Sequence, residues 1–422
     1  MTENNSYMFP TSIKEVKALG WDYIDVILFT GDAFVDHPSF GTAVIARWLQ
    51  KYGYRVAVVP QPNWRDDLRD FRKLGAPRLY FGVNAGAMDS MVNHYTAAKR
   101  LRSDDAYTPE GKAGQRPDYA VTVYTKILKE IYPDIPVIIG GIEASLRRVT
   151  HYDYWQNALK PSILVDSGAD WLCYGMGERT MIEFTKAIEA GRNINDIRKI
   201  PQLGFYMDGR CRTKDAVILN SYERCCKDKV AFAENFHVVE TYANMQNPPV
   251  LVEPVGNGYV QINPTWPPAT QEEMDSFWDL PYTKLPHPRY KGKHIPAFEM
   301  IKFSVNTHRG CFGGCNFCTI AAHQGKFIQS RSEESILKEI AALNRLPGFA
   351  GNISDVGAPT ANMYGMRGKN PELCLKCRRK SCLFPGPCKN MDRSHERLLK
   401  LYERIAKVKG IRHAYIGSGI RY

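Results

Sequence analysis

Three cysteines close together in the last third of the chain have the residue type and spacing best suited to chemistry. They are Cys311, Cys315 and Cys318, within the stretch Cys-Phe-Gly-Gly-Cys-Asn-Phe-Cys. A glycine-containing loop of this length can turn three thiolates onto three corners of one iron–sulfur cube. A structural zinc site would need a fourth ligand, for which His323 is the nearest candidate. Three ligands leave one iron open, and an open iron is available for chemistry.

A family resemblance rests on these cysteines and the residues around them. The spacing C-x3-C-x2-C, with Phe317 just before the last cysteine, is similar to the signature of radical S-adenosylmethionine (SAM) enzymes. Residues 308–332, HRGCFGGCNFCTIAAHQGKFIQSRS, resemble the YgiQ-like branch of that superfamily. The resemblance implies a 4Fe-4S cluster that binds SAM, reductive cleavage of SAM to a 5′-deoxyadenosyl radical, and a reductant protein of the flavodoxin or ferredoxin type. It does not name the substrate.

The resemblance also implies where SAM would be held. Many relatives carry a Gly-Gly-Glu-type motif after the second strand of this half, and this chain has Gly-Ala-Pro-Thr there instead. Because no acid is present, the expected contacts are Gly357 and Thr360. Ser418 and Arg421 lie where relatives place polar groups for SAM or substrate, and an arginine there could pair with the SAM carboxylate. No catalytic residue is assigned.

Four further cysteines lie in a Lys- and Arg-rich insertion over residues 370–390, with the spacing C-x2-C-x4-C-x5-C. They are Cys374, Cys377, Cys382 and Cys388. Four thiolates so close together can close a tetrahedral zinc site or hold an auxiliary iron–sulfur cluster. Neighbouring radical chemistry would favour iron–sulfur, whereas a short segment without a core favours zinc. We expect a second metal centre, and both metals stay open.

Residues 1–200 alternate apolar stretches with amphipathic ones. We expect strands at 22–29, 54–59, 78–83, 137–139 and 169–174, and helices at 40–52, 119–132 and 178–190. This alternation predicts an α/β domain with a doubly wound parallel sheet covered on both faces. The layout resembles the cobalamin-binding-like domain found ahead of many radical SAM domains.

Ligands of such sheets bind at the carboxyl ends of the strands, where glycines at 140–141 and 175–177 fall. The D-x-H-x-x-G motif of histidine-ligated cobalamin domains is missing, because Asp36 and His37 have the wrong spacing. The glycines are therefore interpreted as tight turns, and cobalamin held without a histidine ligand is the alternative. Paired acids and bases in the polar insertion at 84–117 either order it over the sheet edge or only solvate it.

Residues 201–297 are rich in proline and are interpreted as a connector, with short strands at 217–219 and 259–262. Residues 298–422 are expected to form a partial (β/α) radical SAM barrel with three strands, at 301–306, 353–356 and 411–416, and helices at 332–343 and 395–408. The family's partial barrel needs about six strands, so three would leave an open sheet edge. We expect that the barrel is truncated at its C-terminus or that another polypeptide completes it.

The totals for 422 residues, 44% hydrophobic and 24% charged, are typical of a globular protein with two or three domains. No apolar run has the length of a membrane span and the N-terminus is not a signal peptide, so we expect a cytoplasmic protein without a membrane partner. The net charge of +12 would attract polyanions, but Lys and Arg are spread along the chain. The main hypothesis is a radical SAM enzyme with an unknown substrate. The alternative is a non-catalytic, metal-stapled RNA-binding module.

Overall fold

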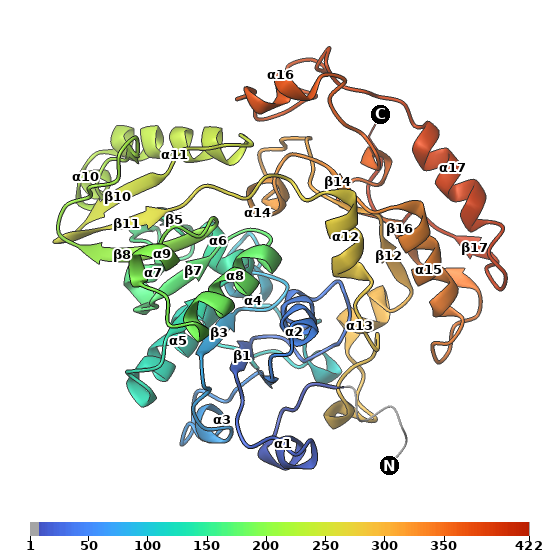
Figure 1. Ribbon diagram of the computed structural model, residues 1–422, viewed down its shortest axis with the longest axis horizontal. Helices are drawn as coiled ribbons and strands as arrows, with labels where there is room; N and C mark the ends of the chain where they lie inside the picture. Colours follow the sequence, from blue (N-terminus) through green and yellow to red (C-terminus); the bar gives the residue numbers. More distant parts are fainter. Residues whose placement is uncertain (1–7, 422) are drawn as a thin grey trace. The chain divides into compact units, whose positions relative to one another are not determined.

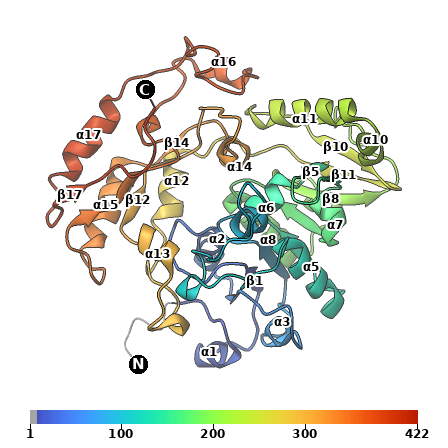
Figure 2. The ribbon, with the colours of Figure 1, turned by 180° about the vertical axis from the view of Figure 1, so that it is seen from behind.

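The computed structural model describes residues 8–421, which fall into two compact units (Figures 1 and 2). The first unit comprises the chain up to Val238 together with Pro249–Thr265 and Leu285–Pro296. The second comprises Val239–Pro248, Trp266–Lys284 and the chain from Ala297 onward. Both predicted cysteine sets therefore lie in the second unit.

A nine-stranded sheet forms the centre of the first unit, in the order β2-β1-β3-β4-β7-β8-β11-β10-β9. The strands from β2 to β7 are parallel, whereas β8, β11 and β10 each run antiparallel to the strand before them in this order, and β9 is parallel to β10. Their bounds are β1 Val26–Thr30, β2 Val56–Pro60, β3 Tyr80–Asn84, β4 Val137–Ile139, β7 Trp171–Cys173, β8 Leu203–Asp208, β9 Val217–Ile218, β10 Leu251–Val255 and β11 Gly258–Ile262.

The prediction of a parallel sheet is therefore correct only for the five strands from the first 200 residues, and the sheet as a whole is mixed. The strands expected at 217–219 and 259–262 are confirmed, and together with β8 and β10 they extend the sheet. Strand β10 was not predicted from the sequence because it contains a proline. Pro254 is tolerated there because β9 pairs only with Leu251 and Val252, so at Pro254 the strand is bonded to β11 alone.

Helices cover the parallel part of this sheet. Helix α2 packs against α8, and α5 packs against α3 and α7. Every residue of β1 and β2 is buried, as continuous apolar strands covered on both faces require. The strands β5 His151–Asp153 and β6 Ala158–Lys160 form a separate hairpin. The α-helices between residues 8 and 243 are α1 Ile13–Ala18, α2 Gly41–Lys51, α3 Arg69–Arg72, α4 Ser90–His94, α5 Ala120–Ile131, α6 Gly141–Leu146, α7 Ile163–Ser167, α8 Glu178–Glu189, α9 Ile194–Ile197, α10 Tyr222–Lys227 and α11 Lys229–Ala243.

The second unit is built on three short parallel stretches, at the three places where strands were predicted. Strand β12 (Ser304–Asn306) pairs with β16 (Asp355–Gly357), and β15 (Asn352–Ile353) pairs with β17 (His413–Ala414). Because β15 and β16 are nearly continuous, this stretch lies between β12 and β17. The remaining elements are α12 Gln271–Trp278, α13 Pro296–Ile301, β13 His308–Arg309, α14 Ile320–Gln324, β14 Gln329–Ser330, α15 Glu333–Leu343, α16 Pro371–Leu375 and α17 Glu396–Ile405.

Helices α15 and α17 pack against each other and cover this small sheet. Their apolar sides close a core with Val305, Ile353 and Val356 from the strands. Both helices are close to the predicted ranges. Between residues 8 and 421, no helix combines the length and the apolar character needed to cross a membrane.

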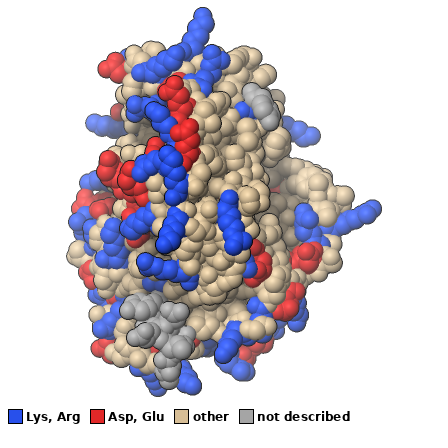
Figure 3. Space-filling view, turned by 90° about the vertical axis from the view of Figure 1, so that its right-hand side faces the viewer, with Lys and Arg blue, Asp and Glu red and all other residues tan. Residues whose placement is uncertain are grey.

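Charged side chains of both signs are interspersed on the face drawn in Figure 3. Lys and Arg stand beside Asp and Glu over most of that face, with uncharged areas between them. The net charge of +12 is therefore not gathered into one continuous basic area on this side.

Candidate functional site

The loop that carries the first cysteine set starts at the carboxyl end of β12. Thr307 donates a backbone hydrogen bond of 2.8 Å to the carbonyl of Gly357, at the end of the neighbouring strand β16. The next residues form β13, which pairs antiparallel with β14. The amide of Cys311 donates to the carbonyl of Gly325 at 3.2 Å. Residues 310–328 therefore form a closed loop whose two ends are held side by side.

The three cysteines differ in burial. Cys311 is buried in a small apolar cluster with Phe312 and three methionines, whereas Cys315 and Cys318 are half-buried. The amide of Cys318 donates to the carbonyl of Cys315 at 3.1 Å, which bends the loop between them. Between residues 8 and 421, no three Cys, His, Asp or Glu side chains already stand in an arrangement that holds a metal ion. In residue type and spacing the three thiols fit an iron–sulfur cluster, and their sulfur atoms would converge on binding.

The structure brings Gly357 and Ser418 together. A side-chain Cβ at Gly357 would lie only 1.9 Å from the Ser418 hydroxyl oxygen, so this close approach requires glycine. One carboxylate oxygen of Asp355 accepts hydrogen bonds from the amide of Gly417 at 2.8 Å and from the amide and hydroxyl of Ser418 at 3.1 Å. Asp355 thus joins the segment after β17 to the end of β16.

Thr360 and Arg421 lie beside the cysteine loop. The Thr360 hydroxyl oxygen is 3.6 Å from the Cys311 sulfur, and the Arg421 guanidinium donates to the Cys315 sulfur at 2.7 Å. This contact raises the pKa of Arg421. The Asn362 side chain fixes the Arg421 backbone, accepting from its amide at 3.0 Å and donating to its carbonyl at 2.6 Å. Of the four residues expected to contact SAM, Thr360 and Arg421 therefore contact the cysteine loop, and Gly357 and Ser418 meet at the end of β16.

Several residues that shape this site were not found from the sequence. Asn362, Ser381 and Lys326 all contact the loop or its neighbours through partners far away in the sequence, so no local spacing marks them. His308 is buried beside Thr307, and burial lowers its pKa to about 3. Its imidazole is therefore neutral at physiological pH. The only sequence signal for it is its place just before the first cysteine.

The four cysteines of the second set are half-buried. The amide of Cys377 donates to the carbonyl of Cys374 at 3.2 Å, and the amide of Cys388 donates to the carbonyl of Cys382 at 2.7 Å. Each half of the set is therefore closed by a backbone turn.

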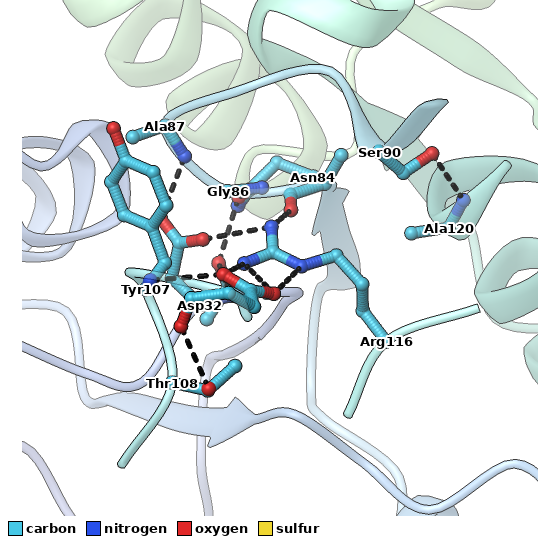
Figure 4. Close-up of polar contacts among 12 residues, drawn as sticks. Asp32, Asn84, Gly86, Ala87, Ser90, Tyr107, Thr108, Arg116 and Ala120 are labelled. Atoms are coloured by element: carbon cyan, nitrogen blue, oxygen red, sulfur yellow. Dashed lines mark hydrogen bonds and ion pairs between the residues drawn. The ribbon is translucent and has the colours of Figure 1, made fainter. Parts of the chain in front are cut away.

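In the first unit, the chain's own polar insertion covers the carboxyl ends of β1 and β3 (Figure 4). Arg116 is buried there and forms ion pairs of 2.9 Å with Asp32 and 3.0 Å with Asp105, and it donates to the carbonyl of Ala85 at 2.8 Å. Burial raises the pKa of Asp32 to about 6 and the guanidinium opposes this shift, so the carboxylate is charged at neutral pH. Asp105 and Arg116 of the insertion, together with Asp32, thus hold the insertion over the ends of these strands.

A second buried group lies at the same edge. Arg147 pairs with Asp89, and Glu143 accepts hydrogen bonds from the amides of Ser90 at 2.9 Å and Val121 at 3.0 Å. A corrinoid would need an open concave surface at the strand ends. Since buried ion pairs and their hydrogen bonds fill this edge, the residues present there do not fit cobalamin.

Comparison with known proteins identifies the family. The family model described as Radical SAM N-terminal matches residues 8–304, a range that ends before Cys311. The chain is 54% identical to a UPF0313 protein of Bacteroides thetaiotaomicron over 98% of its own length, and 44% identical to YgiQ of Escherichia coli K12 over the same share. It belongs to the UPF0313 family. The chain covers 69% and 63% of these two relatives, so it spans about two thirds of the length of the UPF0313 proteins it matches.

Solved structures offer a more distant comparison. The radical SAM methyltransferase TsrM of Kitasatospora setae, solved with cobalamin and a [4Fe-4S] cluster bound, is 17% identical to this UPF0313 chain. The similarity covers 80% of this chain and 47% of TsrM, with a TM-score of 0.43. A likeness this remote transfers no ligand or activity to the chain.

Proposed function

We propose that this UPF0313 chain carries the cluster and SAM site of a radical SAM enzyme. The observation that supports the proposal most is the convergence of the cysteine loop with Gly357, Thr360, Ser418 and Arg421 at one end of three parallel strands. Active sites of strand–helix repeats lie at the carboxyl ends of the strands. A merely structural set of cysteines would not require this polar surrounding.

Each residue of this site would have a separate role in binding the cluster or SAM. Cys311, Cys315 and Cys318 would hold a [4Fe-4S] cluster as thiolates. When bound, this cluster would supply the electron for SAM cleavage. The Arg421 guanidinium would stabilise the charge of the Cys315 thiolate and attract the SAM carboxylate. The absence of a side chain at Gly357 lets the Ser418 hydroxyl approach the end of β16. The apolar cluster around Cys311 would exclude water from the buried side of the loop.

Two components of the activity lie beyond these residues. The electron would come from a reductant protein of the flavodoxin or ferredoxin type, because the site needs a one-electron donor of low potential. The substrate is not identified by any group in the site. A search for changed RNA, protein and metabolite products by mass spectrometry in a strain without this gene would find its class.

Anaerobic reconstitution with iron and sulfide tests the proposal. The chain should become brown and bind at least about four irons, and it should cleave SAM when dithionite supplies electrons. Replacing Cys311, Cys315 and Cys318 together by Ala should abolish cleavage. A matched control is Cys211→Ala, a partly exposed cysteine of the first unit. A colourless protein with one zinc and no SAM binding would contradict the proposal.

The RNA-binding alternative has less support from the structure. Its basic residues are partly engaged within the second unit: Lys380 pairs with Glu240, and Arg379 donates to the carbonyls of Phe384 at 3.0 Å and Gly386 at 2.9 Å. Such local bonds reduce the number of cations available for phosphates. In the reconstitution test, a protein that binds zinc instead of iron and does not bind SAM would favour the RNA-binding module.

A further inference from the structure

The insertion that carries the second cysteine set has almost no core of its own. Between residues 367 and 390 only Ser381 is buried, and the apolar side chains of Leu373 and Phe384 are 58% and 75% exposed. The only regular element in this range is the five-residue helix α16. Ordering so many residues costs conformational entropy that buried apolar area does not offset here. Another interaction must hold the segment together.

The cysteines are the buried side of this segment. Cys382 and Cys388 pack against the same apolar cluster as Cys311 and Phe312. The Cys374 sulfur accepts a hydrogen bond of 3.4 Å from the Asn390 side chain, which belongs to the end of the insertion. The four cysteines are half-buried, whereas the Lys and Arg residues between them are exposed. This is the arrangement expected when the sulfur atoms have a common ligand.

A buried cation faces these thiols. Lys326 is only 2% exposed, and its ammonium lies 3.6 Å from the Cys377 sulfur and donates to the Arg379 carbonyl at 2.6 Å. A buried ammonium is costly unless negative charge stands beside it. Thiolates bound to a metal provide that charge, because four thiolates on a zinc ion or on an oxidised iron–sulfur cube leave a net negative centre.

We propose that Cys374, Cys377, Cys382 and Cys388 bind one metal centre, zinc or an iron–sulfur cluster, and that this centre anchors the Cys311–Cys318 loop. The four sulfur atoms do not yet stand in a metal-holding arrangement, so binding would draw them together. The metal-binding part of this proposal does not depend on the radical SAM function, whereas the anchoring role rests on it.

Direct bonds connect the insertion to the loop. The Ser381 hydroxyl donates to the carbonyls of Phe312 at 3.2 Å and Gly313 at 2.8 Å, and the amide of Cys382 donates to Phe312 at 3.1 Å. Gly314 has a φ of +63°, and a Cβ there would lie 2.7 Å from that of Ser381. Lys326, at the other end of the loop, reaches the insertion as well. A metal centre that fixes the insertion therefore fixes both ends of the loop.

Metal analysis of variants tests the site separately from the proposed function. In the full chain with Cys311, Cys315 and Cys318 all replaced by Ala, one zinc or one cluster of iron should remain after anaerobic purification with both metals supplied. Adding Cys374→Ser and Cys377→Ser should remove it, whereas adding Cys211→Ser and Cys226→Ser instead should not. A triple variant without bound metal, or one whose metal survives Cys374→Ser and Cys377→Ser, would overturn the proposal whether or not the wild-type chain cleaves SAM.

Hydrogen exchange tests the anchoring role. Removing the second metal by chelation from the triple variant should speed exchange of the amides at 311–318 about tenfold, the effect of losing roughly 1.4 kcal/mol of local stabilisation. Ser381→Ala should have a similar effect while leaving the second metal in place. The matched control is Ser276→Ala, which removes a hydroxyl bonded at 2.8 Å within helix α12. Unchanged exchange at 311–318 after chelation would show that the centre does not anchor the loop.

Discussion

At the scale of single residues, Asp355 holds the segment that carries Ser418 and Arg421. One of its carboxylate oxygens accepts three hydrogen bonds from residues 417 and 418. In Asp355→Ala these donors lose a charged acceptor, so we expect the second unit to lose about 2 kcal/mol of unfolding free energy. Exchange at 417–421 should become faster and SAM binding weaker. Denaturant titration and hydrogen exchange would measure the first two effects, and equilibrium dialysis the third.

Asp392→Ala is the control for this prediction. Its carboxylate accepts one exposed hydrogen bond, of 3.1 Å from the amide of Ser394, so its removal should change the unfolding free energy by less than about 0.5 kcal/mol. Equal losses in the two variants would show that Asp355 has no special role in holding the segment.

Glu253 makes the stability of the first unit depend on pH. Its buried carboxyl accepts from the amide of Thr150, and burial raises its pKa to about 7 from an ordinary value of 4.5. The folded state therefore holds the proton more tightly than the unfolded state, and stability falls as pH rises from about 4.5 to about 7. Glu253→Gln should remove this fall and be more stable than wild type by at most about 3 kcal/mol at pH 8. Urea titrations at pH 5 and pH 8 would measure it, and a constant difference between the variants would contradict it.

The spacing of the cysteines was visible in the sequence, but their surroundings were not. C-x3-C-x2-C and C-x2-C-x4-C-x5-C are local patterns, contained in segments of eight and fifteen residues, so they can be recognised without reference to the fold. Asp355, Ser381 and Lys326 act on residues more than fifty positions away. Such contacts depend on how β12, β16 and the insertion come together, which one sequence does not encode in any short pattern.

At the scale of elements, helix α17 packs along one side of the second unit's apolar core. Leu398, Leu401 and Ile405 form its buried stripe, whereas Leu399 is 60% exposed. Leu401→Ala would leave a cavity among the strands and α15, so we expect a loss of about 2–4 kcal/mol in unfolding free energy. Leu399→Ala, the same change on the same helix, should cost less than about 0.5 kcal/mol. Denaturant titration of both variants measures the difference, and similar losses would mean that α17 is not packed as described.

Helices and strands were predicted correctly where apolar residues recur with a clear period. The prediction failed where residues such as proline interrupt that pattern. The buried strands β1 and β2 and the amphipathic helices α15 and α17 appear directly in the apolar spacing. Strands β8 and β10 were not predicted, and in β10 the proline suggests a connector. That proline lies where the strand is bonded on one side only, a tertiary circumstance that propensity does not contain.

At the scale of the whole molecule, the two units have different relations to the proposed ligands. Every residue proposed to bind iron, SAM or the second metal belongs to the second unit, and the strand ends of the first unit are filled by its own ion pairs. The proposed chemistry thus draws on only one of the two compact parts.

This division predicts how cluster loading changes stability across the chain. A ligand that binds only the folded second unit stabilises it by about 2.7 kcal/mol at a hundredfold excess over its dissociation constant. Hydrogen exchange in the presence of iron, sulfide and SAM should therefore slow for amides of β16 and α15 and stay unchanged for β1 and β3, if the units open independently. The variant with Cys311, Cys315 and Cys318 replaced by Ala should show only the part of this protection that the second metal provides. Equal slowing in both units would show that they open as one cooperative body, and slowing confined to the first unit would contradict the placement of the site.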